Sequence, residues 1–327
     1  MTATVQTARG PVPASALGRV LMHEHIFVLS PEVQQNWPHY PEGWDEERHM
    51  ALAADRLAEA KANGIDTIVD LTVLGLGRYV PRIAALAERS EVNLIVATGA
   101  YVVETLPLYF HFRGPGAPAG GPELMTPLFI RDITEGITGT GVKAAILKCV
   151  TDVAGLTRDV ERVLRAVAQA HRETGAPITT HAHAGLRRGL DQQRIFAEEG
   201  VDLSRVIIGH SGDTDDYAYL EQLIDAGSYL GMDRFGLETV PFDKRVEIVA
   251  EMCRRGHADR MVLSHDTSCF SDLSDPVRRA EIYPRWRWTH IPQDVLPALR
   301  QRGVSDDQIH QMLVANPQAI FGRQGGY

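Results

Sequence analysis

The chain has 327 residues, of which 44% are apolar and 23% are charged. This balance is typical of a soluble globular enzyme and argues against a disordered chain or a membrane protein. The formal net charge of −9 is not offset by any basic stretch, which argues against a nucleic-acid partner.

Neither the first residues nor the cysteines point to export. The first ten residues lack the apolar core of a signal peptide, and no later run is apolar enough to span a bilayer. The three cysteines, Cys149, Cys253 and Cys269, are too few and too scattered for a disulfide framework or a CxxC zinc site. The simplest interpretation is a cytoplasmic protein without a membrane partner.

Short apolar runs of β-strand length recur along the chain and alternate with segments of helical periodicity. The apolar runs cover residues 18–22, 67–71, 93–97, 145–148, 178–181, 205–210, 229–232 and 261–264. The clearest helical segments cover residues 45–63, 157–174, 215–226, 242–255 and 293–302. Stop signals support two of these helices, because Asn63-Gly64 ends the first and Gly175 follows the second.

Strands that alternate with helices predict an α/β fold in the form of a (β/α)8 TIM barrel, because right-handed βαβ repeats close a parallel sheet on itself. The barrel would form a single domain over residues 1–327, with residues 1–16 as an N-terminal extension. An open doubly wound sheet is the alternative, but no GxGxxG motif follows the first strand. Two long segments without periodicity, residues 101–127 and 269–290, would lie over the carboxyl end of the barrel, where substrates bind.

The first predicted strand ends in His23-Glu24-His25. Because side chains alternate along a strand, His23 and His25 share a face and Glu24 points away. Two imidazoles at this spacing can reach one metal ion. Taken alone the pattern is weak, since such pairs also occur by chance.

Polar residues also stand at the ends of four later strands: Lys148, His181, His210 and Ser264-His265-Asp266. The carboxyl ends of barrel strands meet at one mouth, so these side chains should converge with the first two histidines. Imidazole and carboxylate suit zinc and similar divalent ions. Spacing alone leaves His181 and His183 as alternatives. It also leaves open whether His265 or Asp266 faces the site, although a carboxylate is the better bridging or proton-carrying group.

Lys148 stands inside the apolar stretch of residues 144–151, which reads as a strand buried on both faces. A buried ammonium costs free energy unless it is paired, deprotonated or chemically altered. The side chain could instead extend to the surface, but Ile146 and Val150 on its own face argue against that. The sequence therefore predicts a functional lysine at this position.

These residues resemble the phosphotriesterase family of the amidohydrolase superfamily over almost the whole chain, from Gly18 to Asn316-Pro317. The resemblance rests on the histidine pair, on Leu-Lys-Cys around Lys148, on Thr180-His181, on Ile208-Gly-His210 and on Asp266. It is closest to the phosphotriesterase-like lactonases, whose motifs are similar to residues 97–101, 231–235 and 284–286.

The resemblance implies a site with two divalent metal ions, zinc first and cobalt, iron or manganese as alternatives. His23, His25 and Asp266 would hold the more buried ion, and His181 and His210 the more exposed one. Lys148 would be carboxylated to a carbamate that bridges both ions, which would explain a lysine in an apolar strand. The resemblance also implies a homodimer, as is usual among the relatives.

The same resemblance implies how the site works. The two ions would activate a shared water, and Asp266 would pass its proton towards the leaving group or solvent. Tyr101 would donate to the developing oxyanion, and Arg234 would hold the polar network of the site. A purely structural hydrogen bond is an equally good interpretation for Arg234.

The implied activity is hydrolysis of lactones, N-acyl-homoserine lactones or related γ- and δ-lactones, with slower promiscuous cleavage of phosphotriesters. Three features favour lactones: the phenol of Tyr101, the short segment 234–240 before the next helix, and an apolar channel formed by Ile282, Tyr283, Trp286 and Trp288. The alternative is a primary organophosphate phosphotriesterase on the same site. Further hypotheses are a Schiff-base aldolase, a mononuclear deaminase or nuclease, and a metal-binding protein without catalysis.

Overall fold

The computed structural model describes residues 3–37, 44–323 and 325–327. A nine-stranded parallel sheet forms the centre, in the order β10-β9-β8-β7-β6-β5-β4-β3-β11. Its strands are β3 (Val20–Val28), β4 (Thr67–Asp70), β5 (Asn93–Gly99), β6 (Ile146–Thr151), β7 (Ile178–Ala182), β8 (Val206–Ile208), β9 (Tyr229–Met232), β10 (Met261–Leu263) and β11 (Ser268–Ser271).

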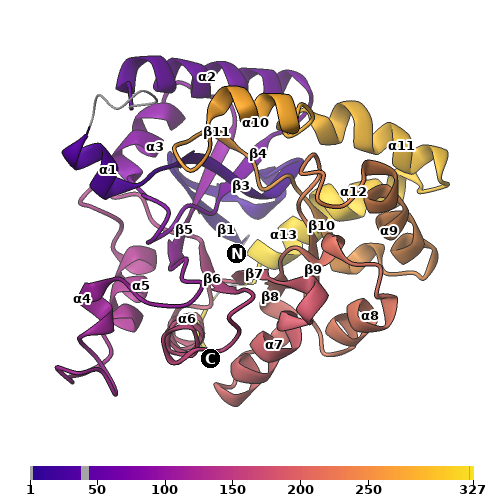
Figure 1. The fold of residues 1–327 in the computed structure, drawn as a ribbon. Coiled ribbons are helices and arrows are strands. Elements are labelled where there is room, and N and C mark those ends of the chain that lie inside the picture. The colour runs from indigo at the N-terminus through magenta and orange to yellow at the C-terminus, as the bar shows by residue number, and fades with distance from the viewer. Residues whose placement is uncertain (1–2, 38–43, 324) are drawn as a thin grey trace.

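The sheet curls until its first and last strands meet. The backbone N–H of Asp266, just after β10, donates to the carbonyl of His23 in β3 over 2.9 Å, and the N–H of His25 donates to the carbonyl of Thr267 over 2.9 Å. The segment from β10 to β11 thus joins the edge of the sheet to β3. The predicted α/β barrel is confirmed, and helices surround the strands (Figure 1).

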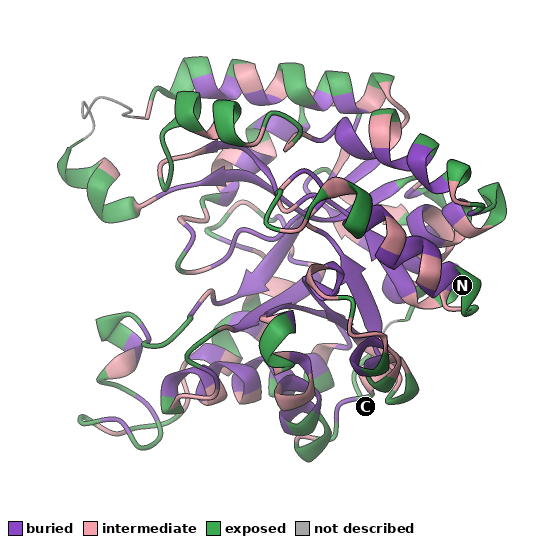
Figure 2. Cartoon of the chain, turned by 45° about the vertical axis from the view of Figure 1, so that its right-hand side comes forward, coloured by how far each residue is buried: buried purple, intermediate pink, exposed green. Residues whose placement is uncertain are grey.

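The helices cover the outside of the barrel with their apolar faces turned inward. Figure 2 shows this as purple inner faces and green outer faces. The helices are α1 (Pro31–Asn36), α2 (Glu46–Ala62), α3 (Val80–Ala87), α4 (Leu108–His111), α5 (Met125–Thr134), α6 (Arg158–Thr174), α7 (Arg188–Glu198), α8 (Tyr217–Asp225), α9 (Phe242–Arg254), α10 (Pro276–Ile282), α11 (Leu296–Gln301), α12 (Asp306–His310) and α13 (Asn316–Phe321).

Capping residues explain why the longest predicted helices lie where they do. Asp45 accepts a hydrogen bond from the N–H of Arg48 at the start of α2, and Thr157 accepts one from Val160 at the start of α6. Gly175 ends α6 in the left-handed conformation, at φ 76°, where glycine has no Cβ penalty. Both helices agree with the sequence prediction.

Two strands continue beyond the residues where the sequence predicted their ends. β3 runs on to Val28 instead of ending at His25, and β6 runs to Thr151 instead of ending at Lys148. The predicted boundaries were wrong because polar residues inside a strand resemble a strand end. The pairing of β3 with β4 also shifts register between Leu21 and Glu24, and such irregularities re-aim side chains next to sites.

The two segments predicted to be long loops contain regular structure. Residues 101–127 include α4, and residues 269–290 include most of β11 and all of α10. These elements are four to seven residues long. Segments this short carry too few residues to show a period.

Two layers of apolar residues hold the barrel together. The inner layer fills the barrel below the mouth and includes Met22, Val69, Ile95, Ile146 and Val262. The outer layer lies between the strands and the helices. Residues 4–13 form a hairpin of β1 (Thr4–Thr7) and β2 (Gly10–Pro13) that contributes Val5 to the inner layer.

None of the helices in the described ranges combines the length and the apolar character that crossing a membrane requires.

Candidate metal centre

The first group of predicted ligands converges at the seam of the barrel. His23, His25 and Asp266 bring one ligand atom each to within 4.8 Å of one another. The Nε2 atoms of the two histidines lie 3.3 and 3.2 Å from Oδ1 of Asp266. Neutral imidazoles and a carboxylate at this spacing are a suitable donor set for one divalent ion.

Lys148 lies beside this group and not at the surface. Its side chain is buried, and its Nζ is 2.9 Å from Nε2 of His23. Burial lowers the pKa of Lys148 from 10.5 to about 8. Gly99 on the neighbouring strand has φ +128°, and a Cβ there would lie 2.0 Å from the carbonyl oxygen of Lys148, so only glycine fits.

The second group of predicted ligands lies across the same cavity. Nε2 of His210 is 3.0 Å from Nδ1 of His181, and the ring of His210 stacks on the ring of His23 at 5.0 Å. Burial is the largest cause that lowers the pKa values of His23, His181 and His210, which favours the neutral imidazoles that bind metals. The donors therefore fit a pair of divalent ions.

The alternatives that spacing left open are distinguished by hydrogen bonds. His183 accepts a hydrogen bond at Nδ1 from the N–H of Leu186 and caps a short helical turn. His265 is fully buried beside Glu24, with Nδ1 2.7 Å from a carboxylate oxygen. His181 and Asp266, not these two neighbours, line the cavity.

Asp233, at the end of β9, is a residue that sequence reasoning missed. One carboxylate oxygen lies 2.7 Å from Nδ1 of His23, and the other lies 2.9 Å from Nδ1 of His210. The carboxylate therefore orients one histidine of each group and turns both Nε2 atoms towards the cavity. The sequence does contain one hint of this role, because Asp233 directly follows the predicted strand 229–232. From the sequence, only its neighbour Arg234 was given a role.

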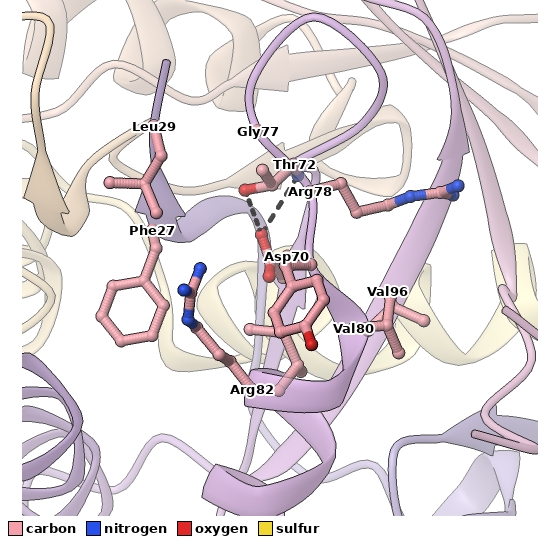
Figure 3. A pocket seen from close by; sticks show the side chains of 11 residues that line it. Phe27, Leu29, Asp70, Thr72, Gly77, Arg78, Val80, Arg82 and Val96 are labelled. Atoms are coloured by element: carbon pink, nitrogen blue, oxygen red, sulfur yellow. Dashed lines mark hydrogen bonds between the residues drawn. The ribbon is translucent and has the colours of Figure 1, made fainter. Parts of the chain in front are cut away.

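A second acidic support stands behind His25. Nδ1 of His25 lies 3.0 Å from Oγ1 of Thr72, and this hydroxyl donates to Asp70 over 2.6 Å. Burial raises the pKa of Asp70. Figure 3 shows Thr72 and Asp70 on the wall of a cavity of about 10 Å³, room for about one water, with Phe27 nearby. This cavity shares no lining residue with the cavity that contains the predicted ligands.

Tyr101 and Arg234 lie at the positions the sequence predicted, on the wall of the site. The ring of Tyr101 meets the ring of His181 edge to face at 5.7 Å, and burial raises the pKa of the phenol to about 12. Arg234 donates from Nε to Oδ2 of Asp266 over 3.2 Å and from Nη1 to Asp213 over 2.8 Å. The phenol stays protonated at neutral pH and the guanidinium fixes the carboxylate.

Backbone strain is concentrated in the site. His210 and Asp266 have φ values of 61° and 55°, in the left-handed region that costs a non-glycine residue free energy. In the ranges that the structure describes, only Thr138 and Arg187 among the other non-glycine residues share this feature. Such strain persists where the surroundings hold it for a function.

The site opens into a cavity of about 370 Å³. Its lining includes all eight predicted site residues: His23, His25, Tyr101, Lys148, His181, His210, Arg234 and Asp266. Apolar side chains form much of the remaining wall, including Leu76, Leu237 and Leu273.

The predicted apolar channel is correct in part. Tyr283 and Trp286 line the cavity as expected. Ile282 is 47% exposed on the outside of α10 and is not part of the wall. Trp288 is buried and lines a different cavity. Their assignment to the channel was wrong because sequence position alone does not show the direction of a side chain on an irregular segment.

Comparisons with known proteins agree with this arrangement. The family model described as Phosphotriesterase family matches residues 3–321. The chain is 62% identical over 325 residues to a "Phosphotriesterase homology protein" of Mycobacterium tuberculosis, covering 99% of both chains. It is 39% identical to an "Aryldialkylphosphatase" of Saccharolobus solfataricus, covering 95% of this chain and 96% of the relative.

A solved structure is similar over the same length. The "Structure of the phosphotriesterase from Mycobacterium tuberculosis" superposes with a TM-score of 0.97 and 61% sequence identity, and the match covers 99% of this chain and 100% of that one. Family match, relatives and fold therefore lead to one conclusion. The chain belongs to the phosphotriesterase family, whose members are hydrolases.

Proposed function

We propose that the protein is a hydrolase with two divalent metal ions that opens lactones and cleaves phosphotriesters more slowly. The observation that carries the proposal is the cavity of about 370 Å³ in which Tyr101 and Arg234 face the histidine and aspartate cluster around Lys148. Its donors suit divalent ions, and its outer wall suits an apolar acyl chain.

In this proposal His23, His25 and Asp266 would hold the inner ion, and His181 and His210 would hold the outer one. Lys148 would contribute to the same site as a carbamate, since addition of CO2 to its neutral amine releases one proton and leaves an anion with two oxygen donors. Zinc is the first candidate, with cobalt, iron and manganese as alternatives. When bound, the ions supply Lewis-acid polarisation and lower the pKa of water.

The protein's own side chains move the proton and receive the charge. Asp266 accepts the proton of the attacking water, and the N–H donor of Arg234, 3.2 Å from Oδ2, keeps that carboxylate in place. The phenol of Tyr101 donates a hydrogen bond to the substrate oxygen on which negative charge grows. The high pKa of this phenol suits a donor role, because the hydroxyl keeps its proton.

The shape of the mouth supports lactones ahead of phosphotriesters. Only residues 235–241 separate Arg234 from the start of α9 at Phe242, so little chain covers this side of the cavity. Leu237 and Leu273 leave an apolar wall beside it. N-acyl-homoserine lactones or related γ- and δ-lactones combine a flat ester ring with an apolar chain, which suits this cavity.

A primary organophosphate phosphotriesterase is the second candidate. It is favoured by the name of the Saccharolobus solfataricus relative, an aryldialkylphosphatase. The same ions and the same proton acceptor would serve a phosphoryl centre.

Specificity constants on one metal form distinguish the two candidates. Lactones with medium or long acyl chains should exceed paraoxon-like phosphotriesters, and metal analysis should find two ions per chain. A tenfold advantage for phosphotriesters would favour the second candidate. Two bound ions without hydrolysis of any lactone or phosphotriester would contradict both candidate functions.

A further inference from the structure

Arg279 on α10 lines the metal cavity and also a second cavity beside it. The second cavity has a volume of about 320 Å³. Ser271, Tyr283 and Trp286 line both cavities with Arg279 and form their shared wall. A molecule whose reacting group lies at the histidine cluster can therefore reach this guanidinium from inside the metal cavity.

Three arginines line the second cavity, and only part of their positive charge is paired within the protein. Its lining includes Arg56, Arg279 and Arg287, and no carboxylate belongs to it. Arg287 has Asp294 at 3.3 Å. Within the described part of the chain, neither Arg56 nor Arg279 forms an ion pair with a carboxylate.

The hydrogen bonds of these two arginines go to neutral acceptors. Arg279 donates to Oγ1 of Thr267, to Oγ of Ser268 and to the carbonyl of Ser268, over 2.7 to 3.3 Å. Arg56 donates to the carbonyls of Ser268 and Cys269 over 3.0 and 2.9 Å. Both guanidiniums are thus held against one short strand, β11, by hydrogen bonds that leave their charge without a directly bonded carboxylate.

The two arginines differ in burial, since Arg56 is exposed to solvent and Arg279 is half-buried. Burial lowers the pKa of Arg279 to about 10, and the charge of Arg56 acts in the same direction, whereas the carboxylate of Asp266 acts against it. Arg279 also stacks on Trp286, with 4.3 Å between guanidinium carbon and ring centroid, which fixes its plane. A fixed guanidinium with open donors is the group that recognises carboxylates and related oxyanions. This local excess of positive charge contrasts with the net charge of −9 of the whole chain.

We propose that Arg279 and Arg56 form a subsite for an oxyanion group, a carboxylate first, carried by the substrate at a distance from the bond that is hydrolysed. The inference rests on the proposed hydrolytic function and extends its substrate class from neutral lactones to esters or lactones with an anionic substituent. Arg279 reaches the group from the shared wall, and Arg56 adds charge from the second cavity.

Matched substrates test the subsite. The substrates are mono-p-nitrophenyl adipate, which carries a carboxylate, and its neutral methyl ester. Their kcat/KM values are measured for the wild type, Arg279→Gln, Arg56→Gln and the control Arg278→Gln, an exposed neighbour on α10. The ratio of charged to neutral substrate should fall tenfold or more in Arg279→Gln, by a smaller factor in Arg56→Gln, and not in the control.

A purely structural role would give another result. Arg279 also anchors β11, so its loss could loosen the mouth. Loosening lowers kcat/KM for both substrates alike and leaves their ratio unchanged. An unchanged ratio in Arg279→Gln would therefore overturn the inference.

Binding without turnover separates this inference from the proposed function. Calorimetry on the metal-loaded protein compares adipate, neutral adipamide and inorganic phosphate. Arg56 does not line the metal cavity, so weaker adipate binding in Arg56→Gln places the anion in the second cavity and not on the metals. Adipate binding that depends on both arginines supports the subsite even if no ester is hydrolysed. Binding of phosphate alone, with no preference for charged substrates, would assign the site to a free anion and overturn the proposal.

Discussion

Carbamate formation on Lys148 makes the sharpest prediction, because the reaction needs a neutral amine. Burial lowers the pKa of Lys148 from 10.5 to about 8. At pH 7 the neutral fraction rises from roughly 1 in 3,000 to roughly 1 in 10, a gain of about 300-fold. The structure therefore predicts that the lysine takes up CO2 near neutral pH.

The assay is recovery of activity when the metal-free protein is mixed with zinc at constant dissolved CO2 and varied pH. A group with a lowered pKa is protonated below that value, so recovery should slow as pH falls. Between pH 8.5 and 6.5 the neutral amine, and with it the rate, should fall by about 25-fold. Above pH 9 the rate should reach a plateau.

A lysine with an ordinary pKa gives a different curve. Its rate would keep rising about tenfold per pH unit through pH 9. That outcome would refute the argument from burial. A rate of recovery that does not depend on the CO2 concentration would refute the formation of a carbamate. Lys148→Ala serves as the control, since it should not respond to CO2 and should regain partial activity with short-chain carboxylates.

Three further predictions concern the other side chains. Asp266→Asn should lower kcat far more than it changes KM, because the amide keeps the shape but does not accept the proton; steady-state kinetics on a lactone checks this. Asp233→Ala should weaken metal binding by about 10- to 100-fold, measured by competition with a chelator, while the exposed Asp215→Ala should not. Tyr101→Phe should lower kcat for lactones by about tenfold or more through loss of one donor, and an unchanged kcat would remove the phenol from the mechanism.

Much of the fold was predictable because strong local signals agree with it. Each of the eight predicted apolar runs overlaps a strand of the sheet, and α2 and α6 end where their stop signals stand. The elements that sequence reasoning missed are short or weakly periodic, such as β11 and α10. Their positions depend on contacts with β3 and with the barrel mouth, which no local pattern contains.

The candidate site divides in the same way. Residues at strand ends, such as His181 and His210, were predicted because a barrel brings strand ends together. Spacing alone did not distinguish His181 from His183, and only the family resemblance favoured His181, since the difference depends on the turn that His183 caps. Asp233 was missed because its role depends on hydrogen bonds to two histidines from other parts of the chain, His23 in β3 and His210 just after β8. A carboxylate that holds two imidazoles has no signature in a single sequence.

The seam of the barrel has a consequence for how the protein keeps its shape. The ligands predicted for the inner ion come from both sides of this seam: His23 and His25 from β3, and Asp266 from the segment after β10. The residues that meet at the seam are about 240 positions apart along the chain. An ion bound between them would act as a cross-link, and cross-links across long loops restrict the unfolded chain most. Loss of a ligand would then loosen the whole barrel as well as stop turnover. In many enzymes the active-site residues reduce the stability of the fold. In this protein the bound ion would instead stabilise the fold, because it would link β3 to the segment after β10.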